Sequence, residues 1–244
     1  MYIDLHTHKI NPHENLIAVY STLPDHFPEN HPENWLISAG IHPWLCNKDD
    51  FAEACDVFET LPETPGLNWN RDYDLAMRQW LEKLEQLAAN NKIIAIGEIG
   101  LDRVHNKDME TQNTMFEAQL RIAEKYNLPV IVHCVRAFPE ILSLRKIYHK
   151  TPWIIHAFRS NVEIAGQLIG HDCFLSFGEA LLKSHELQML AKVIPLESLF
   201  LESDQSELPI EELYAGTARI MSLDLSCLQL NIIKNFKKVF FQQK

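Results

Sequence analysis

The sequence predicts an α/β protein, a TIM-type (β/α)8 barrel of 244 residues that lacks one or two of the first outer helices. Three observations lead to this fold class. Short apolar runs typical of strands recur along the whole chain, longer amphipathic stretches separate most of them, and a single α/β barrel typically takes about 250 residues. We therefore expect one barrel domain over residues 1–244.

The predicted strands are runs of aliphatic and aromatic residues, each ending near a polar side chain. There are eight, at Tyr2–Leu5, Leu16–Tyr20, Trp35–Ala39, Ile93–Ile96, Val130–Val132, Trp153–Ile155, Phe174–Phe177 and Leu199–Leu201. In a parallel barrel the carboxyl ends of all strands meet at one mouth. Side chains that follow these strands should therefore be neighbours in space.

Amphipathic stretches between the strands predict helices. They cover residues 49–61, 73–90, 109–127, 137–149, 161–170, 184–193, 209–221 and 225–241. In the stretch at 109–127, Phe116, Leu120 and Ala123 fall on one helical face, and Asn127-Leu128-Pro129 ends the helix.

The segments that follow the first and second predicted strands are not expected to form crossover helices. Residues 8–15 are too few for one, and residues 24–34 contain three prolines and two asparagines. The apolar strand surface on that side must then be covered by a loop, by the C-terminal helix or by a second subunit. A homodimer is thus one of the predicted assemblies.

The charge and the cysteines restrict the class of protein. A net charge of −11 and a pI near 5.5 argue against a broad basic surface for duplex nucleic acid, although bound metal ions could make one pocket positive. The five cysteines are scattered and form no CxxC pair, which predicts reduced thiols. No signal-peptide pattern or long apolar run is present, so we expect a cytoplasmic protein without a membrane partner.

Six side chains of the kinds that bind metal follow predicted strands. His6 and His8 are two residues apart, so strand alternation places both imidazoles on one face. Any of the six alone could be a core or capping residue. Together they predict a metal site at the barrel mouth, made of His6, His8, Glu98, His133, His156 and Asp204.

The mixture of imidazole and carboxylate ligands limits the metal without identifying it. Zinc, manganese, iron, cobalt, nickel and magnesium all remain candidates. Six ligands exceed the three that one catalytic zinc usually has, so we expect two divalent ions that share Glu98, with a hydroxide between them as the nucleophile.

Six short stretches, in order along the chain, carry a family resemblance. They are Ile3-Asp4-Leu5-His6-Thr7-His8, Ala39-Gly40-Ile41-His42-Pro43, Ala95-Ile96-Gly97-Glu98-Ile99-Gly100-Leu101-Asp102, Pro129-Val130-Ile131-Val132-His133, Ile155-His156-Ala157-Phe158 and Leu201-Glu202-Ser203-Asp204. At these residues the sequence resembles the TatD-type metal-dependent hydrolases, the TatD-like deoxyribonuclease family of the amidohydrolase superfamily.

The resemblance implies a metal-dependent barrel that hydrolyses phosphodiesters. The family's activity is that of a deoxyribonuclease, often an exonuclease, and a 3′–5′ exonuclease is one form that this chain could take. It assigns the predicted ligands to two metal ions. Asp204 and Glu98 would be catalytic, Asp204 by handling the proton of the attacking water. One ion would be held by His6, His8, Glu98 and Asp204, and the other by Glu98, His133 and His156.

Further residues are candidates for contact with the substrate. His42 is similar to the family's phosphate-contacting histidine, and its alternative is a role in stabilising its own loop. Arg136 and Arg159 each follow a ligand histidine by three residues and could hold phosphate or form surface ion pairs. Strand alternation would aim Glu202 at the mouth, while Asp102 would orient a ligand.

The chain departs from the family pattern where substrate is bound. Gln205-Ser206-Glu207-Leu208-Pro209 leads directly into a helix, where the family has a Ser-Pro-rich loop, and His133-Cys134-Val135-Arg136 replaces the commoner His-Ser-Arg. Three interpretations stay open. The leading one is a phosphodiesterase acting on nucleic-acid ends or a small phosphoester. The second is a two-metal hydrolase of a small ester, amide or phosphate ester. The third is a non-catalytic binding module.

Overall fold

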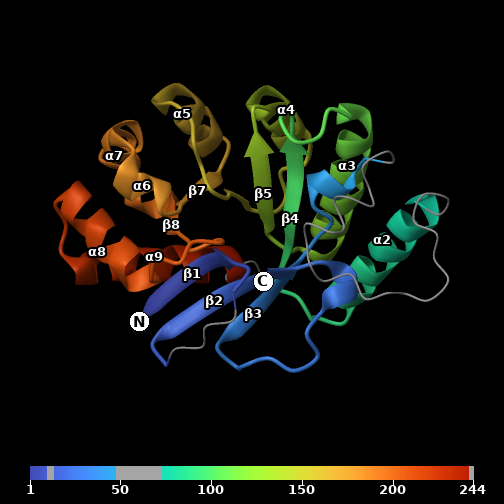
Figure 1. The fold of residues 1–244 in the computed structure, drawn as a ribbon, viewed down its shortest axis with the longest axis horizontal. Coiled ribbons are helices and arrows are strands. Elements are labelled where there is room, and N and C mark those ends of the chain that lie inside the picture. Colours follow the sequence, from blue (N-terminus) through green and yellow to red (C-terminus); the bar gives the residue numbers. More distant parts are fainter. Residues whose placement is uncertain (10–13, 48–72, 242–244) are drawn as a thin grey trace.

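The computed structural model describes residues 1–9, 14–47 and 73–241. The strands form one parallel eight-stranded sheet in the order β1 to β8, which curves into a barrel (Figure 1). This arrangement confirms the predicted fold class. The strands are β1 (Tyr2–Thr7), β2 (Leu16–Thr22), β3 (Trp35–Ala39), β4 (Ala95–Asp102), β5 (Val130–Val135), β6 (Trp153–Ile155), β7 (Cys173–Phe177) and β8 (Leu199–Leu201).

The first and last strands meet and close the barrel. The Asp204 N–H donates to the carbonyl of His6 at 2.9 Å, and the His8 N–H donates to the carbonyl of Asp204 at 3.3 Å. Beside this seam the buried Asp4 carboxylate accepts hydrogen bonds from the backbone N–H and the hydroxyl of Ser203, at 2.8 and 2.6 Å. The seam therefore fixes residues of both strands at the barrel mouth.

Helices follow the strands around the outside of the barrel (Figure 1). The predicted helix at 49–61 lies outside the described residues, and the other predicted helices are present. The helices are α2 (Tyr73–Ala89), α3 (Met109–Tyr126), α4 (Phe138–Ile147), α5 (Val162–Gly170), α6 (Ala180–Lys183), α7 (His185–Ala191), α8 (Ile210–Met221) and α9 (Leu225–Phe241), with 3-10 turns η1 (Pro24–His26), η2 (Pro43–Leu45) and η3 (Leu196–Ser198).

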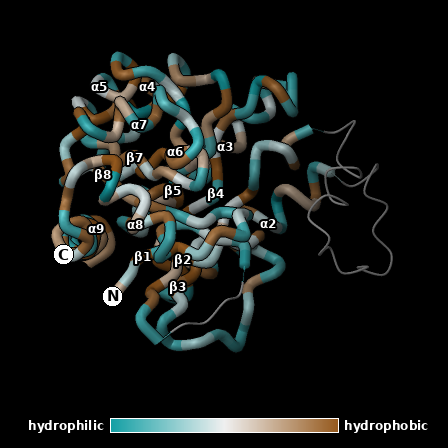
Figure 2. Tube along the Cα trace, turned by 60° about the vertical axis from the view of Figure 1, so that its left-hand side comes forward, coloured by the Kyte–Doolittle hydropathy of each residue, from teal (hydrophilic) through white to brown (hydrophobic). Residues whose placement is uncertain are grey.

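The connection between β2 and β3 contains no α-helix; its one regular element is η1. This confirms the prediction for residues 24–34. On the neighbouring side, α8 and α9 contact β1 and β8, and Figure 2 shows α9 beside these strands. The C-terminal helix thus covers β1, whereas the homodimer stays a prediction.

The core lies inside the barrel and between the barrel and its helices. Every residue of β4 is buried, because this strand faces α3 on one side and the barrel interior on the other. Trp35, Trp153 and Phe200 are among the large side chains with almost no exposed surface. Among the described residues, no helix is long and apolar enough to cross a membrane.

Tyr214 connects α8 to β1 through hydrogen bonds, so its hydroxyl is expected to contribute to the free energy of unfolding. Its buried hydroxyl donates to the Ile3 carbonyl at 2.9 Å and accepts from the Ile3 N–H at 3.2 Å. Tyr214→Phe leaves both backbone groups unpaired and is expected to lower the free energy of unfolding by about 1–3 kcal/mol in urea denaturation. Tyr126→Phe, which removes a half-buried hydrogen bond to Glu85, is the control and should cost less than about 0.5 kcal/mol. Equal losses in the two variants would contradict this role of Tyr214.

Candidate metal centre

The six predicted ligands lie together at the carboxyl end of the barrel. Together with His42, they form groups that could hold a metal ion, with the donor atoms of each group within 4.8 Å of one another. The strand ends converge there, so residues far apart in the sequence become neighbours. The groups are His6, Glu98 and His156; His6, His8 and Asp204; and His42, Glu98 and His133.

Glu98 is at the centre of this cluster. Its Oε2 lies 3.2 Å from His6 Nε2 and 3.5 Å from His8 Nε2. Its Oε1 lies 2.6 Å from His133 Nδ1 and 2.8 Å from His156 Nε2. One buried carboxylate therefore faces two pairs of imidazoles, one on each oxygen, as a bridging ligand would.

The close approach of β4 and β5 brings Glu98 and His133 together. Gly100 pairs with His133 in the parallel register. A Cβ atom on Gly100 would lie 2.0 Å from the His133 carbonyl oxygen, and Gly100 has a φ of +150°, so a residue with a side chain would push the strands apart. The glycine thus sets the distance between two members of the cluster.

His42 also belongs to the cluster, although the sequence assigned it to the substrate. It is buried, and its Nε2 lies 3.2 Å from Glu98 Oε1 and 3.3 Å from His133 Nδ1. The Trp44 N–H donates to its Nδ1 at 3.2 Å. His42 lies three residues after the end of β3, on the same side of the barrel as the six predicted ligands, so its position in the sequence was a signal that it belonged with them.

Two carboxylates orient imidazoles of the cluster from behind. Asp102 Oδ2 lies 3.1 Å from His133 Nε2, which leaves Nδ1 directed at Glu98. Glu202 Oε1 lies 3.2 Å from His156 Nδ1 and accepts from the Ala157 N–H at 2.6 Å. Hydrogen bonds of this kind fix the tautomer and the direction of a metal-binding histidine.

Glu202 is buried behind His156. Its side chain is 0% exposed, and its Oε1 is engaged by His156 and Ala157. These contacts orient the imidazole, and the predicted contact of Glu202 with a substrate stays a prediction. Alternation correctly predicted that Glu202 points inward, but it could not show that His156 and Ala157 lie in front of it.

The charges of the cluster are strongly coupled. Burial alone would raise the pKa of Glu98, but the imidazoles of His156 and His42 and a hydrogen bond from His133 hold that pKa well below its usual range. Burial would lower the pKa of His156, yet Glu98 and Glu202 raise it well above its ordinary value. Burial lowers the pKa of His42 to about 4, so this imidazole is neutral at pH 7.

Asp204 occupies the open side of the cluster. Its side chain is 36% exposed, and its Oδ1 lies 3.9 Å from His6 Nε2 and 3.8 Å from His8 Nε2. Its φ is 52°, in the left-handed region that residues other than glycine seldom adopt, and Ala157 shares this region with a φ of 43°. Non-glycine residues in this conformation gather at functional sites because surrounding contacts must hold them there.

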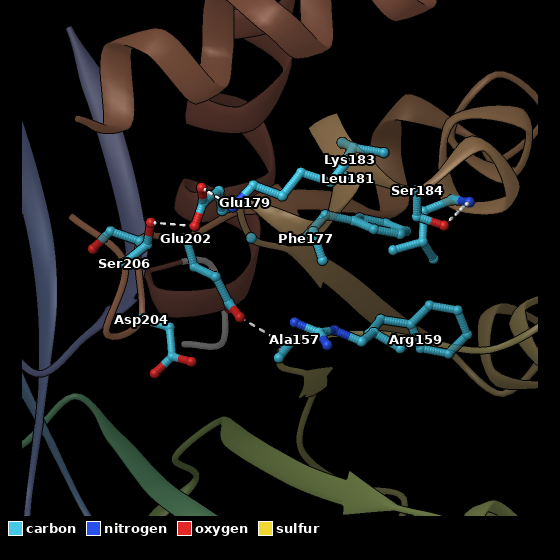
Figure 3. A pocket seen from close by; sticks show the side chains of 15 residues that line it. Ala157, Arg159, Phe177, Glu179, Leu181, Lys183, Ser184, Glu202, Asp204 and Ser206 are labelled. Atoms are coloured by element: carbon cyan, nitrogen blue, oxygen red, sulfur yellow. Dashed lines mark hydrogen bonds and ion pairs between the residues drawn. The ribbon is translucent and has the colours of Figure 1, made fainter. Parts of the chain in front are cut away.

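Arg136 follows β5 and Arg159 follows β6, and both are exposed to solvent. Neither makes an ion pair with another residue in the described parts of the chain, which leaves the predicted surface pairing without support. Arg159 lines a cavity together with Asp204, and Figure 3 shows its guanidinium directed toward Asp204 and Ala157.

His6 tests whether the cluster fits a metal ion. Its side chain is 0% exposed, and neither ring nitrogen makes a hydrogen bond within the described structure, although Nε2 lies 3.2 Å from Glu98 Oε2. Buried polar atoms without hydrogen-bond partners are rare in folded proteins, and a bound ion can supply the contact that such an atom needs. Imidazole nitrogens and carboxylate oxygens are also the donors that divalent transition metals prefer. The residues therefore fit a metal.

The comparisons with known proteins agree with this geometry. The TatD related DNase family matches residues 26–240. Deoxyribonuclease Tat-D of Schizosaccharomyces pombe is 31% identical over 146 residues, which cover 56% of this chain and 47% of that protein. The 3′-5′ ssDNA/RNA exonuclease TatD of Escherichia coli is 32% identical over 134 residues, half of each chain. The matched segments thus span about half the length of these two relatives.

Solved structures agree on the fold. YjjV, a TatD homologue from Escherichia coli, superposes with a TM-score of 0.75 at 19% identity and covers 98% of this chain and 97% of its own. A TatD family hydrolase from Entamoeba histolytica gives a TM-score of 0.71 at 16% identity and covers 98% of each chain. With the family match extending over most of the sequence, the chain belongs to the TatD related DNase family.

Proposed function

We propose that this protein is a divalent-metal-dependent hydrolase that cleaves phosphodiester bonds at the ends of DNA strands. The observation that carries the proposal is the buried Glu98 carboxylate between imidazoles on both of its oxygens, with Asp204 on the open side. The family match and the names of the relatives, a deoxyribonuclease and an exonuclease, support the substrate class.

Two metal ions are proposed, and they share Glu98. His6, His8 and Asp204 would complete one ligand set, and His133 and His156 the other, while His42 is close enough to Glu98 to join the second set. Bound divalent ions would act as Lewis acids on phosphoryl oxygens and lower the pKa of a water molecule to about 7.

The protein groups have separate roles in the proposed reaction. Asp102 and Glu202 hold the His133 and His156 rings in fixed orientations. The exposed Asp204 carboxylate accepts a proton from the attacking water. A new P–O bond then forms to the water oxygen, the ester P–O bond breaks, and the departing oxygen gains a proton.

The substrate contacts are proposed on the rim of the site. Arg136 and Arg159 present guanidinium groups there that form no ion pair with a described residue, and a guanidinium can hold a phosphate through two parallel hydrogen bonds. His42 is buried against Glu98, so we assign it to the metal cluster and not to the rim.

A substrate panel tests this function. Purified protein is incubated with Mn²⁺, Mg²⁺ or Zn²⁺ and offered single-stranded DNA labelled internally, bis(p-nitrophenyl) phosphate and a p-nitrophenyl carboxyl ester. We expect metal-dependent release of mononucleotides from the DNA. Ester hydrolysis without DNA cleavage would favour the small-ester alternative, and metal binding without turnover of any substrate would favour the non-catalytic module.

A further inference from the structure

A cavity of about 450 Å³ opens next to Asp204 (Figure 3). Its walls come from the turn after β6, the residues around α6, and the loop after β8. Because Asp204 contributes to both, the cavity continues from the candidate metal centre. Its volume falls within the range of roughly 300–1,000 Å³ that is typical of small-molecule sites.

The charged groups of this cavity leave one unpaired cation among the described residues. Glu179 pairs with Lys183 and also accepts a hydrogen bond from the Ser206 hydroxyl at 2.9 Å. Glu202 is held by His156 and by the Ala157 N–H. Arg159 has no hydrogen bond or ion pair to any residue that the structure describes. A ligand with an anionic group would therefore find its partner at Arg159.

Another part of the lining is an apolar wall. Its partly exposed residues are Ala157, Gly178 and Ala180, and Leu187 also lines it. Phe177 and Leu181 have almost no exposed surface and belong to the core beneath. An anion-binding side chain together with an apolar wall suits an amphiphilic ligand, with phosphate at one end and a flat ring at the other.

We propose that this cavity is the subsite for the single terminal nucleotide of a DNA strand. The phosphate beside Asp204 contacts Arg159, and the base lies against Ala180 and Leu187. This inference rests on the proposed function, since it names where the cleaved end of the substrate sits. Residues of α6 and the start of α7 line the cavity, and its volume is large enough for one nucleotide.

Binding of mononucleotides tests the subsite independently of turnover. The probes are deoxythymidine 5′-monophosphate and deoxythymidine 3′-monophosphate, titrated calorimetrically into metal-loaded protein. Arg159→Ala removes a charge-assisted hydrogen bond. It is expected to weaken binding of the mononucleotide with the higher affinity about 10- to 100-fold, and Arg159→Lys should restore part of that affinity. Arg219→Ala on α8, an exposed arginine that does not line the cavity, is the matched control and should bind as the wild type does.

A second variant tests the cavity itself. Ala180→Leu places three more carbon atoms into the space that the base would occupy, and it is expected to weaken mononucleotide binding at least about tenfold while metal content stays unchanged. Ala180→Ser, with a side chain of nearly the same size, is its control.

The outcomes separate this subsite from the proposed function. Wild-type affinity in both Arg159→Ala and Ala180→Leu, or no binding of either mononucleotide to the wild type, would overturn the subsite even if DNA is cleaved. Nucleotide binding that depends on Arg159 and Ala180 would support the subsite even if no DNA is cleaved, and in that case the proposed function alone would fail.

Discussion

Glu98→Gln is expected to reduce DNA cleavage about 1,000-fold or more. The substitution keeps the shape of the side chain but removes the negative charge that faces His6, His8, His133 and His156. An amide is a poor ligand for these metals and cannot bridge two of them, so several kcal/mol of transition-state stabilisation would be lost.

The measurement is kcat/KM together with metal content by elemental analysis. We expect the variant to hold fewer equivalents of metal than the wild type does. Glu110→Gln, in the exposed first turn of α3, controls for the loss of one carboxylate and should leave both quantities unchanged. Near-normal cleavage by Glu98→Gln would rule out Glu98 as the shared ligand.

Removal of metal is expected to abolish cleavage completely and to lower the melting temperature. In the metal-free protein His6 is left buried with no hydrogen bond to either ring nitrogen within the described structure. Because the folded state alone gathers the ligands, a metal at 100 times its Kd stabilises that state by about 2.7 kcal/mol.

Dialysis against a chelator, then titration of Mn²⁺, Mg²⁺ or Zn²⁺, measures this effect by thermal denaturation and by cleavage of single-stranded DNA. His6→Ala lacks one buried ligand and should regain less stability on titration than the wild type. Arg219→Ala, which lies outside the cluster, should recover fully. Turnover that persists when elemental analysis finds no metal would refute the metal-dependent mechanism.

The positions of the strands could be predicted because each is a short apolar run, but their lengths could not. The sequence suggested that the fourth strand ended at Ile96, before Glu98, whereas β4 continues to Asp102. Polar side chains usually mark the end of a buried strand, and here Glu98 and Asp102 are buried because histidines pair with them. The polar residues Glu98 and Asp102 thus made the predicted strand shorter than β4 is.

The helices show a similar limit of local patterns. The helix predicted at 184–193 is present as α7, but the four-residue helix α6 before it was not predicted. Ser184 separates the two helices and caps α7 through the Leu187 N–H. A helix as short as α6 has too few residues to show a periodic pattern. Yet α6 lines the cavity beside Asp204, so the element that shapes the proposed nucleotide subsite was the one least visible in the sequence.

The site could be predicted as a set of residues but not as an arrangement. Spacing after strands selected six residues that lie close together, whereas the burial of His42 and Glu202 depends on side chains from other strands. The distances between site residues depend on how closely neighbouring strands approach, and Gly100 allows such a close approach at His133. Such contacts join residues that no local pattern connects.

The seam between β1 and β8 also sets the order in which the site is completed during synthesis. His6 and His8 leave the ribosome well before Asp204 does, and the Asp4–Ser203 contact joins residues 199 positions apart. Contacts of such long sequence separation form late, because the chain entropy of a large loop must be lost first. A nascent chain therefore carries an incomplete set of the predicted ligands until β8 docks against β1.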